Sequence, residues 1–279
     1  MPSLIRKILE ETSAKAQAEY VASGLDVVGD LAVLRLTDLD EKAKVEVAEA
    51  LLKEVKNVKG VYEQEGGIEG EFRLRRLRHL AGDRRTTTVH RENGFFYELD
   101  LASCYFSPRL STERLRVSMQ VKAGERVLNM FAGVGPFTVP IARKNPVVSC
   151  ELNPSAFEYH ERNNARNKVS KSVRMLNADA KLLPELVSEK FDRIIMPHPS
   201  KAEEFLGAAL AVAGESAIIH YYRHLPGMDE SEAGESIKKE LNELLPRKCS
   251  YAVRRVRAVG PRWLEMAAEI SLGAQNGRF

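Results

Sequence analysis

The stretch that decides the fold is Val127-Leu-Asn-Met-Phe-Ala-Gly-Val-Gly-Pro-Phe137, which has the pattern of a short apolar strand followed by a glycine turn and a helix. Gly133 and Gly135 let the backbone approach a ligand closely, and the N-terminus of the following helix offers unpaired N–H groups to a carboxylate. The stretch has only two glycines, so it does not meet the three-glycine fingerprint of dinucleotide-binding domains. It predicts a ligand site at the end of a strand.

The chain around this stretch alternates strands and helices. Such alternation favours a parallel, doubly wound α/β sheet. Two last strand-like runs, 251–256 and 263–270, are predicted to pair as an antiparallel edge. Seven strands with this ending indicate the Rossmann-like sheet of class I methyltransferases, as opposed to NAD-binding domains. The other predicted strands are 126–131, 146–151, 172–177, 191–196 and 216–221, separated by helices at 136–144, 154–167, 180–188 and 200–212.

The first hundred residues predict a small α+β unit. A hairpin is expected because Asn93-Gly94 supplies the positive φ values that a tight turn needs. We therefore expect two domains, 1–101 and 102–279. The other elements predicted here are helices at 3–22 and 41–56 (the second capped by Asp38 or Asp40), two short strands around Gly29-Asp30, a strand at 58–62, a glycine turn at 66–70, and the hairpin strands 85–90 and 95–101.

Composition narrows the class of protein. A chain of 279 residues with 44% hydrophobic composition can bury a proper core, and its net charge of +3 decides nothing by itself. Cys104, Cys150 and Cys249 lie far apart, which excludes a disulfide framework and a cysteine-rich zinc site and fits a reducing cytoplasm. No apolar run approaches the length of a membrane span, and the charged N-terminal stretch lacks the apolar core of a signal peptide, so none is expected. We expect a soluble cytoplasmic protein with no metal, no membrane contact and no protein partner.

Two acidic residues follow the next strands in order. Glu151 ends the second strand, where a carboxylate can accept hydrogen bonds from both ribose hydroxyls of a nucleoside. Asp179 follows the third strand, where it can accept a hydrogen bond from an adenine amino group. Taken singly, a glycine pair is usually a turn and such an acid is usually a helix cap. Their order on successive strand ends predicts S-adenosylmethionine as the cofactor.

Several longer runs of sequence carry a family resemblance. They are Tyr105-Phe-Ser-Pro-Arg-Leu-Ser-Thr-Glu113-Arg, Asn129-Met-Phe-Ala-Gly-Val-Gly-Pro-Phe137, Ile218-Ile-His-Tyr-Tyr222, Gly70–Gly82 and Val89–Gly94. Together they resemble the archaeal and eukaryotic tRNA guanosine-37 N1-methyltransferases, over nearly the whole chain. The resemblance implies a catalytic Rossmann-like domain preceded by a small RNA-contacting domain, with the anticodon loop of tRNA as the partner.

The resemblance also implies roles for individual residues. Guanine N1 carries a proton at neutral pH, so its methylation needs a base and a donor that stabilises the charge on O6. Glu113 is expected to be the base and Arg73 the donor. The expected cofactor contacts are Tyr105, Arg109, Phe131, Gly133, Gly135, Glu151 and Asp179, and the expected substrate contacts are Arg75, Arg76, His198 and Pro199.

The chain departs from the family pattern at two places. Pro197-His198-Pro199 stands where the family has Asn-Leu-Pro, so the asparagine that would hold guanine is replaced. Archaeal members usually carry a further N-terminal domain, and this chain is expected to begin after it. Both departures leave open the sister family, the wybutosine-pathway aminocarboxypropyltransferases. The first also leaves open a tRNA-binding relative without catalysis. Ser107-Pro-Arg109 and Gly135-Pro-Phe137 favour methyl transfer.

Basic residues are clustered, which supports an RNA partner. The run Arg73–Arg91 is rich in arginine and has a single acid, Asp83. Such a run is expected to follow phosphates, and the ordinary alternative is a solvated surface. Arg254, Arg255, Arg257 and Arg262 form a second basic cluster, expected on the same side.

Overall fold

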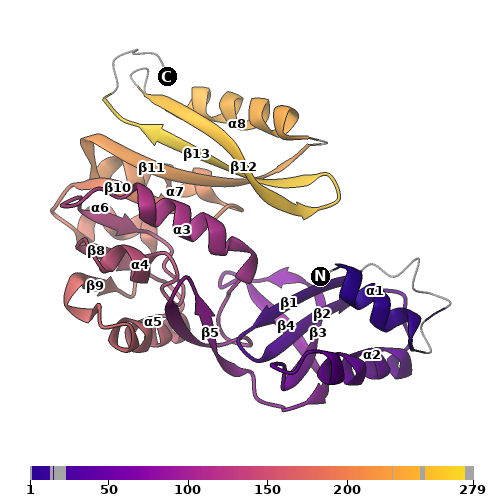
Figure 1. The fold of residues 1–279 in the computed structure, drawn as a ribbon. Helices are drawn as coiled ribbons and strands as arrows, with labels where there is room; N and C mark the ends of the chain where they lie inside the picture. The colour runs from indigo at the N-terminus through magenta and orange to yellow at the C-terminus, as the bar shows by residue number, and fades with distance from the viewer. Residues whose placement is uncertain (1, 13–14, 16–22, 228, 246–248, 274–279) are drawn as a thin grey trace.

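The computed structural model describes residues 2–12, 15, 23–227, 229–245 and 249–273. Its larger unit is built on a seven-stranded sheet (Figure 1). The strands are β7 (Val127–Asn129), β8 (Val147–Cys150), β9 (Val173–Leu176), β10 (Phe191–Met196), β11 (Ala213–Pro226), β12 (Ser250–Gly260) and β13 (Trp263–Ser271). Their spatial order is β12-β13-β11-β10-β7-β8-β9. β7 to β11 pair in parallel, and β13 is antiparallel to both of its neighbours. The predicted class I methyltransferase sheet is confirmed.

Helices cover both faces of this sheet, because successive strand residues point to opposite sides. Leu128 and Tyr221 join a core with α6, α7 and α8, whereas Val127 and Tyr222 join a second core with α3 and α4. α8 was not predicted. The helices are α3 (Ser111–Gln120), α4 (Thr138–Ala142), α5 (Pro154–Arg166), α6 (Leu183–Leu186), α7 (Ala202–Val212) and α8 (Glu230–Leu244), with 3₁₀ turns η2 (Pro108–Leu110), η3 (Ser170–Ser172) and η4 (Ala180–Leu182).

The N-terminal unit is a four-stranded sheet in the order β1-β2-β3-β4, with two helices packed on one face. Asp40 caps the second helix by accepting a hydrogen bond from the Ala43 amide, as predicted. Residues 13–14 and 16–22 of the predicted first helix lie outside the described residues. The elements are α1 (Pro2–Glu10), β1 (Ser23–Val28), β2 (Leu31–Leu36), α2 (Glu41–Glu54), β3 (Gly60–Glu69) and β4 (Leu74–Gly82).

One strand of this unit, β4, was not predicted, and β3 runs through the expected glycine turn at 66–70. The apolar positions of β4 do not alternate, so its sequence lacks the usual strand pattern. The strand is supported instead by charge pairing across the sheet. Arg78 lies opposite Glu63 in the β3–β4 register, and Arg76 lies opposite Glu65. Opposite charges on facing strands stabilise the pair.

A hairpin links the two units. β5 (Thr87–Glu92) and β6 (Phe95–Asp100) pair across Asn93 and Gly94, which have φ values of 51° and 83°, so the predicted turn is confirmed. The hairpin contacts α5, and Tyr97 packs into a core of the larger unit while Leu99 packs with residues of the N-terminal sheet. The predicted domain boundary at residue 101 therefore stays a prediction. Among the described residues, no helix has the length and apolar composition needed to cross a membrane.

Candidate cofactor and RNA site

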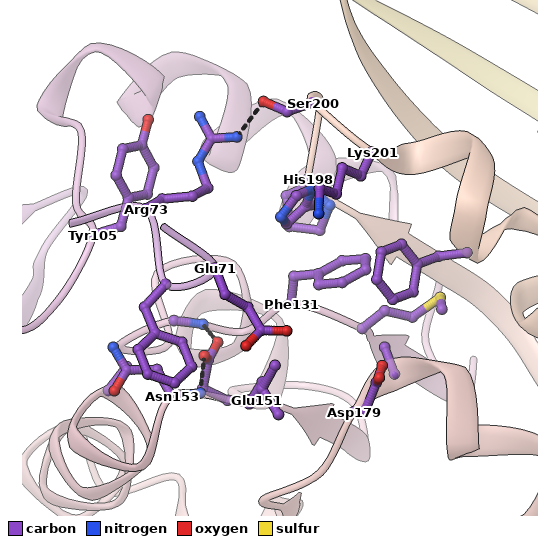
Figure 2. Close-up of a pocket in the computed structure, with 18 of the residues that line it drawn as sticks. Glu71, Arg73, Tyr105, Phe131, Glu151, Asn153, Asp179, His198, Ser200 and Lys201 are labelled. Atoms are coloured by element: carbon purple, nitrogen blue, oxygen red, sulfur yellow. Dashed lines mark hydrogen bonds between the residues drawn. The ribbon is translucent and has the colours of Figure 1, made fainter. Parts of the chain in front are cut away.

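A cavity of about 340 Å³ lies at the carboxyl ends of the central strands, where open α/β sheets bind ligands. Figure 2 shows the acidic side chains of Glu71, Glu151 and Asp179 around it, with Arg73 and His198 on the opposite side. Its volume falls in the range of small-molecule sites. Five of the expected cofactor contacts line the cavity: Tyr105, Phe131, Gly133, Glu151 and Asp179.

Glu151 is fixed by the backbone around it. One carboxylate oxygen accepts a hydrogen bond from the Gly133 amide at 2.6 Å, and the other accepts one from the Asn153 amide at 2.8 Å. Burial raises the pKa of Glu151, and these two amide hydrogen bonds act in the opposite direction. A carboxylate has four lone-pair positions, so it retains acceptor capacity for two ribose hydroxyls. The glycine turn and the end of β8 thus orient one carboxylate toward a ligand.

The rest of the cavity fits an adenosine group. Asp179 caps η4 by accepting a hydrogen bond from the Lys181 amide at 2.9 Å, so it is a cap as well as a lining residue. The ring of Phe131 lies edge-on to Phe205, with the two ring centres 4.8 Å apart, and offers an apolar wall. The contacts of Glu151 with the ribose hydroxyls of S-adenosylmethionine, of Asp179 with the adenine amino group and of Phe131 with the cofactor stay predictions, and the cavity leaves room for all three.

The two glycines of the turn differ in their surroundings. Gly133 lines the cavity, and no atom lies closer than 4.0 Å to a Cβ built on it. Gly135 does not line the cavity. Its φ is 93°, and a Cβ there would lie 2.4 Å from Cδ2 of His160, a buried residue of α5. The structure thus gives Gly135 a packing function between the turn and α5, while its direct contact with the cofactor stays a prediction.

Arg73 stands at the mouth of the cavity. It occupies the turn between β3 and β4 with a φ of 57°, and its guanidinium lies 5.0 Å from the centre of the Tyr105 ring. It donates a hydrogen bond to Oγ of Ser200 at 2.7 Å. Arg73, Tyr105 and Ser200 also line a second cavity of about 680 Å³, which lies next to the first.

Glu113 lies apart from both cavities. It is buried at the start of α3, where it pairs with Arg116 at 2.8 Å and with Arg254. Tyr222 donates a hydrogen bond to its Oε1 at 2.6 Å. Glu113 is not among the residues that line the cofactor cavity or the second cavity. The structure therefore does not bring the two expected catalytic residues, Glu113 and Arg73, to one cavity.

The expected run of basic residues does not lie on one surface, since strand geometry divides it. Arg75 points into the protein and pairs with Asp26 at 3.2 Å, whereas its neighbour Arg76 is exposed. Arg78 is paired with Glu41 and Glu63, and Arg85 with Asp30 and Asp83. A period of two sends successive side chains to opposite faces. The run therefore does not form one exposed stripe, and its contact with tRNA phosphates stays a prediction.

Arg109, expected at the cofactor, lies in the second cavity, where its Nε donates to Asp26 at 2.6 Å. Of the C-terminal basic cluster, Arg257 also lines that cavity. Arg254 pairs with Glu113 instead, and Arg255 is exposed outside the cavity lining. Of the two basic regions, Arg73 and Arg75 of the first and Arg257 of the second line this cavity.

His198 and Pro199 have different surroundings. His198 lines the cofactor cavity, with its ring centre 5.0 Å from that of Phe131. Burial, and then the charge of Arg73, lowers the pKa of His198 to about 4, so its ring is neutral at pH 7. Pro199 does not line the cavity, and its carbonyl accepts a hydrogen bond from the His224 amide at 3.0 Å.

Sequence reasoning missed Glu71 and Ser200, which both line the cofactor cavity. Ser200 follows β10, and its place after the end of a central strand is a signal that points to the site. Glu71 lies in the β3–β4 turn, and nothing in the sequence distinguishes it from a surface acid. Its position depends on the unpredicted strand β4.

The sheet order and the cavity define a class I, S-adenosylmethionine-dependent methyltransferase. Residues 88–249 match the model of the TRM5/TYW2 methyltransferase domain, and residues 5–86 match that of the TYW2 N-terminal domain. The chain belongs to the TRM5/TYW2 methyltransferase family.

Relatives include enzymes with different tRNA products. The chain is 34% identical over 275 residues to tRNA (guanine(37)-N(1))-methyltransferase Trm5b of Methanocaldococcus jannaschii, covering 97% of this chain and 77% of that protein. It is 41% identical over 211 residues to Trm5b of Pyrococcus abyssi, covering 75% of this chain and 62% of that protein. It is 33% identical over 276 residues to tRNA 4-demethylwyosine(37)-methyltransferase Taw21 of Saccharolobus solfataricus, covering 97% of this chain and 99% of that protein.

Solved structures share the fold along nearly all of the chain. The complex of aTrm5 with tRNALeu matches with a TM-score of 0.85 and 33% identity, covering 96% of this chain and 78% of that one. Methanocaldococcus jannaschii Trm5 in complex with adenosine matches with a TM-score of 0.79 and 32% identity, covering 97% and 79%.

Proposed function

We propose that this protein transfers a methyl group from S-adenosylmethionine to N1 of guanosine-37 in the anticodon loop of tRNA. The observation that carries the proposal is the junction of two cavities. The cofactor cavity meets an arginine-lined cavity at Arg73, Tyr105 and Ser200, so a base can enter one cavity while its backbone stays in the other. The named activities of the two Trm5b relatives and the aTrm5 complex with tRNALeu support the same substrate.

The chemistry requires charge control at the base. The cofactor supplies an electrophilic methyl group when it is bound. Loss of the N1 proton shifts negative charge onto O6, and a fixed cation beside O6 stabilises that charge. We propose that Arg73 is this cation, since it stands where the two cavities meet and its charge is permanent.

Glu113 is the proposed base, in a position that requires movement. In the structure its carboxylate is enclosed by Arg116, Arg254 and Tyr222. To take a proton from N1, this carboxylate has to leave at least part of that network. We therefore propose that RNA binding rearranges the ion pairs of Glu113.

A second candidate function is methyl transfer to 4-demethylwyosine at the same tRNA position. The Saccharolobus solfataricus relative named for this reaction aligns over nearly the whole length of both proteins, unlike the Trm5b relatives. His198 adds to this candidate, because a neutral imidazole that lies against Phe131 presents a flat surface beside the cofactor cavity. A relative from Pyrococcus horikoshii is named as a tRNA(Phe) (4-demethylwyosine(37)-C(7)) aminocarboxypropyltransferase. Transfer of the aminocarboxypropyl group is therefore the third candidate reaction to test.

One labelling experiment separates these reactions. The protein is incubated with cofactor labelled separately in the methyl and aminocarboxypropyl carbons, and with tRNA that carries either guanosine or 4-demethylwyosine at position 37. Mass spectrometry of the nucleosides then locates the label. Methyl label at N1 of guanosine supports the main proposal. Methyl label only on 4-demethylwyosine supports the second candidate, aminocarboxypropyl label supports the third, and no label on either tRNA supports a binding protein without catalysis.

The cytoplasm is the proposed compartment. The three cysteines are free, and two of them, Cys104 and Cys150, are buried. Free buried thiols are the usual state in a reducing compartment. Fractionation of cells that express a tagged copy tests this assignment.

A further inference from the structure

The second cavity, here called the arginine cleft, lies between the N-terminal sheet and the end of the β12–β13 hairpin. Figure 1 shows the turn of this hairpin reaching over toward the N-terminal unit. Six arginines and two carboxylates are among the residues that line the cleft. Glu240 and Glu265, which lie outside the lining, pair with Arg223 and Arg257, so two positive charges remain in excess. Such an excess of cations favours a polyanion. The lining residues that carry charge are Arg35, Arg73, Arg75, Arg109, Arg223, Arg257, Asp26 and Glu203.

Two of these arginines share one buried carboxylate, Asp26, and a third, Arg35, lies within reach of its charge. Asp26 accepts hydrogen bonds from Nη2 of Arg75 at 3.2 Å and from Nε of Arg109 at 2.6 Å. Burial lowers the pKa of Arg35, and the charges of Arg109 and Arg75 act in the same direction while Asp26 opposes them. Positive charge therefore exceeds negative charge at this side of the cleft.

Arg75 adds unsatisfied hydrogen-bond donors to this side of the cleft. Its side chain is only 3% exposed, yet Nε and Nη1 have no hydrogen-bond partner within the part of the chain that the structure describes. Buried donors are normally satisfied, because leaving them unpaired costs free energy. A phosphate oxygen is a strong acceptor for such a group.

The opposite side of the cleft carries an aromatic ring. Trp263 is the only tryptophan of the chain, and it is 47% exposed at the start of β13, opposite Gly260. An exposed indole within an arginine-lined cleft is typical of a stacking platform for bases of single-stranded nucleic acid.

We propose that the arginine cleft binds the nucleotide adjacent to the modified one, with its phosphate against Arg35 and Arg109 and its base stacked on Trp263. The proposal rests on the proposed function, which puts the target base beside Arg73 and Tyr105. A single phosphodiester joins neighbouring nucleotides, so the next one has to lie close to those two residues. The cleft is the cavity that shares both of them.

Tryptophan fluorescence tests the stacking directly. Because Trp263 is the only tryptophan, its emission reports on this cleft alone. Titration with an anticodon stem-loop RNA, without cofactor, should quench the emission with the same Kd as an independent filter-binding measurement. Trp263→Leu should weaken RNA binding roughly 5- to 100-fold, whereas Trp263→Phe, which keeps a ring, should stay within about threefold of the wild type.

The salt dependence of binding tests the phosphate contact. Arg35→Gln should reduce the slope of log Kd against log salt by about 0.7, the value for one phosphate contact on a single strand. Arg255→Gln is the matched control, because Arg255 is exposed and does not line the cleft. Equal slopes in Arg35→Gln and the wild type would overturn the phosphate contact.

The stacking proposal fails if RNA binds with unchanged emission and Trp263→Leu keeps its affinity. It also fails if an acidic peptide quenches Trp263 as well as the RNA does, since this would indicate a protein partner. Neither result depends on group transfer, so the proposed function is judged separately by the labelling experiment. If the RNA quenches Trp263 but receives no label, the result contradicts the proposed function and supports RNA binding in the arginine cleft.

Discussion

The guanidinium of Arg73 lies 5.0 Å from the centre of the Tyr105 ring, in a cation–π contact at the junction of the two cavities. The contact holds the charge in place beside the space where a base would enter, while Ser200 fixes the other side of the group.

Arg73→Ala should therefore reduce kcat by about 10²- to 10³-fold, the usual effect of removing one donor to a developing negative charge. The affinity for S-adenosylmethionine, measured by titration calorimetry, should change by less than about threefold. Arg76→Ala is the control, because Arg76 is an exposed neighbour that lines neither cavity. A similar kcat in the Arg73 and Arg76 variants would remove Arg73 from the chemistry.

Glu151→Ala should weaken cofactor binding by roughly 100-fold or more, because two hydroxyl hydrogen bonds to a charged acceptor are lost, each worth about 1.5–3 kcal/mol. Glu158→Ala, on the following helix, is the control, since the side chain of Glu158 is 70% exposed. Calorimetry compares the two variants, and unchanged affinity in Glu151→Ala would contradict the placement of the ribose at the end of β8.

Gly135→Ala should destabilise the fold by about 2–4 kcal/mol. The added Cβ meets His160 at 2.4 Å, and the φ of 93° disfavours a side chain. Gly207→Ala is a matched control on the exposed side of α7, where an added Cβ meets nothing within 4 Å. That variant should gain about 0.5–1 kcal/mol, because alanine favours the helix. Urea unfolding measures the free energy of unfolding of both variants. A Gly135→Ala variant as stable as the wild type would show that α5 moves to accommodate the added Cβ.

The stability of the fold should decrease as the pH falls from about 6.5 to 4. Burial lowers the pKa of His90 and of His198 to about 4, and that of His160 to about 3. The unfolded chain, with ordinary histidine pKa values, binds more protons in this window, so protonation favours unfolding. His198→Asn should make this loss smaller. Above pH 7, the stability of the variant should depend on pH as that of the wild type does. Urea unfolding at a series of pH values checks this, and a slope equal to that of the wild type would contradict the burial of His198.

The sequence predicted the catalytic sheet because its strands are short apolar runs that end in recognisable turns. It also placed Glu151 and Asp179 correctly at one edge, since parallel strands bring their carboxyl ends together. It missed β4, whose support comes from carboxylates on β3 that no local pattern reveals. For the same reason the Arg73–Arg91 run looked continuous, although the strand splits it between two faces and Asp26, distant in sequence, holds Arg75 and Arg109.

Glu113 is expected both to stabilise the fold through its ion pairs and to act as the base. Its carboxylate is 4% exposed and pairs with Arg116 and Arg254, whose side chains are 25% and 34% exposed. Glu113→Gln should cost on the order of 1–3 kcal/mol of stability, because two partly exposed arginines lose their partner. If Glu113 also removes the N1 proton, kcat should fall by about 10²- to 10⁴-fold.

Tyr222→Phe separates the two effects. It removes the hydrogen bond that Tyr222 donates to Glu113 but keeps the carboxylate and both ion pairs. A structural role alone predicts that Glu113→Gln loses stability while its kcat per folded molecule stays near that of Tyr222→Phe. A base predicts that Glu113→Gln is at least tenfold slower than Tyr222→Phe, at equal cofactor affinity and saturating tRNA. Single-turnover methylation, corrected for the folded fraction by circular dichroism, makes this comparison. Equal rates in the two variants would rule Glu113 out as the base. Glu71, whose carboxylate lines the cofactor cavity, would then be the next candidate.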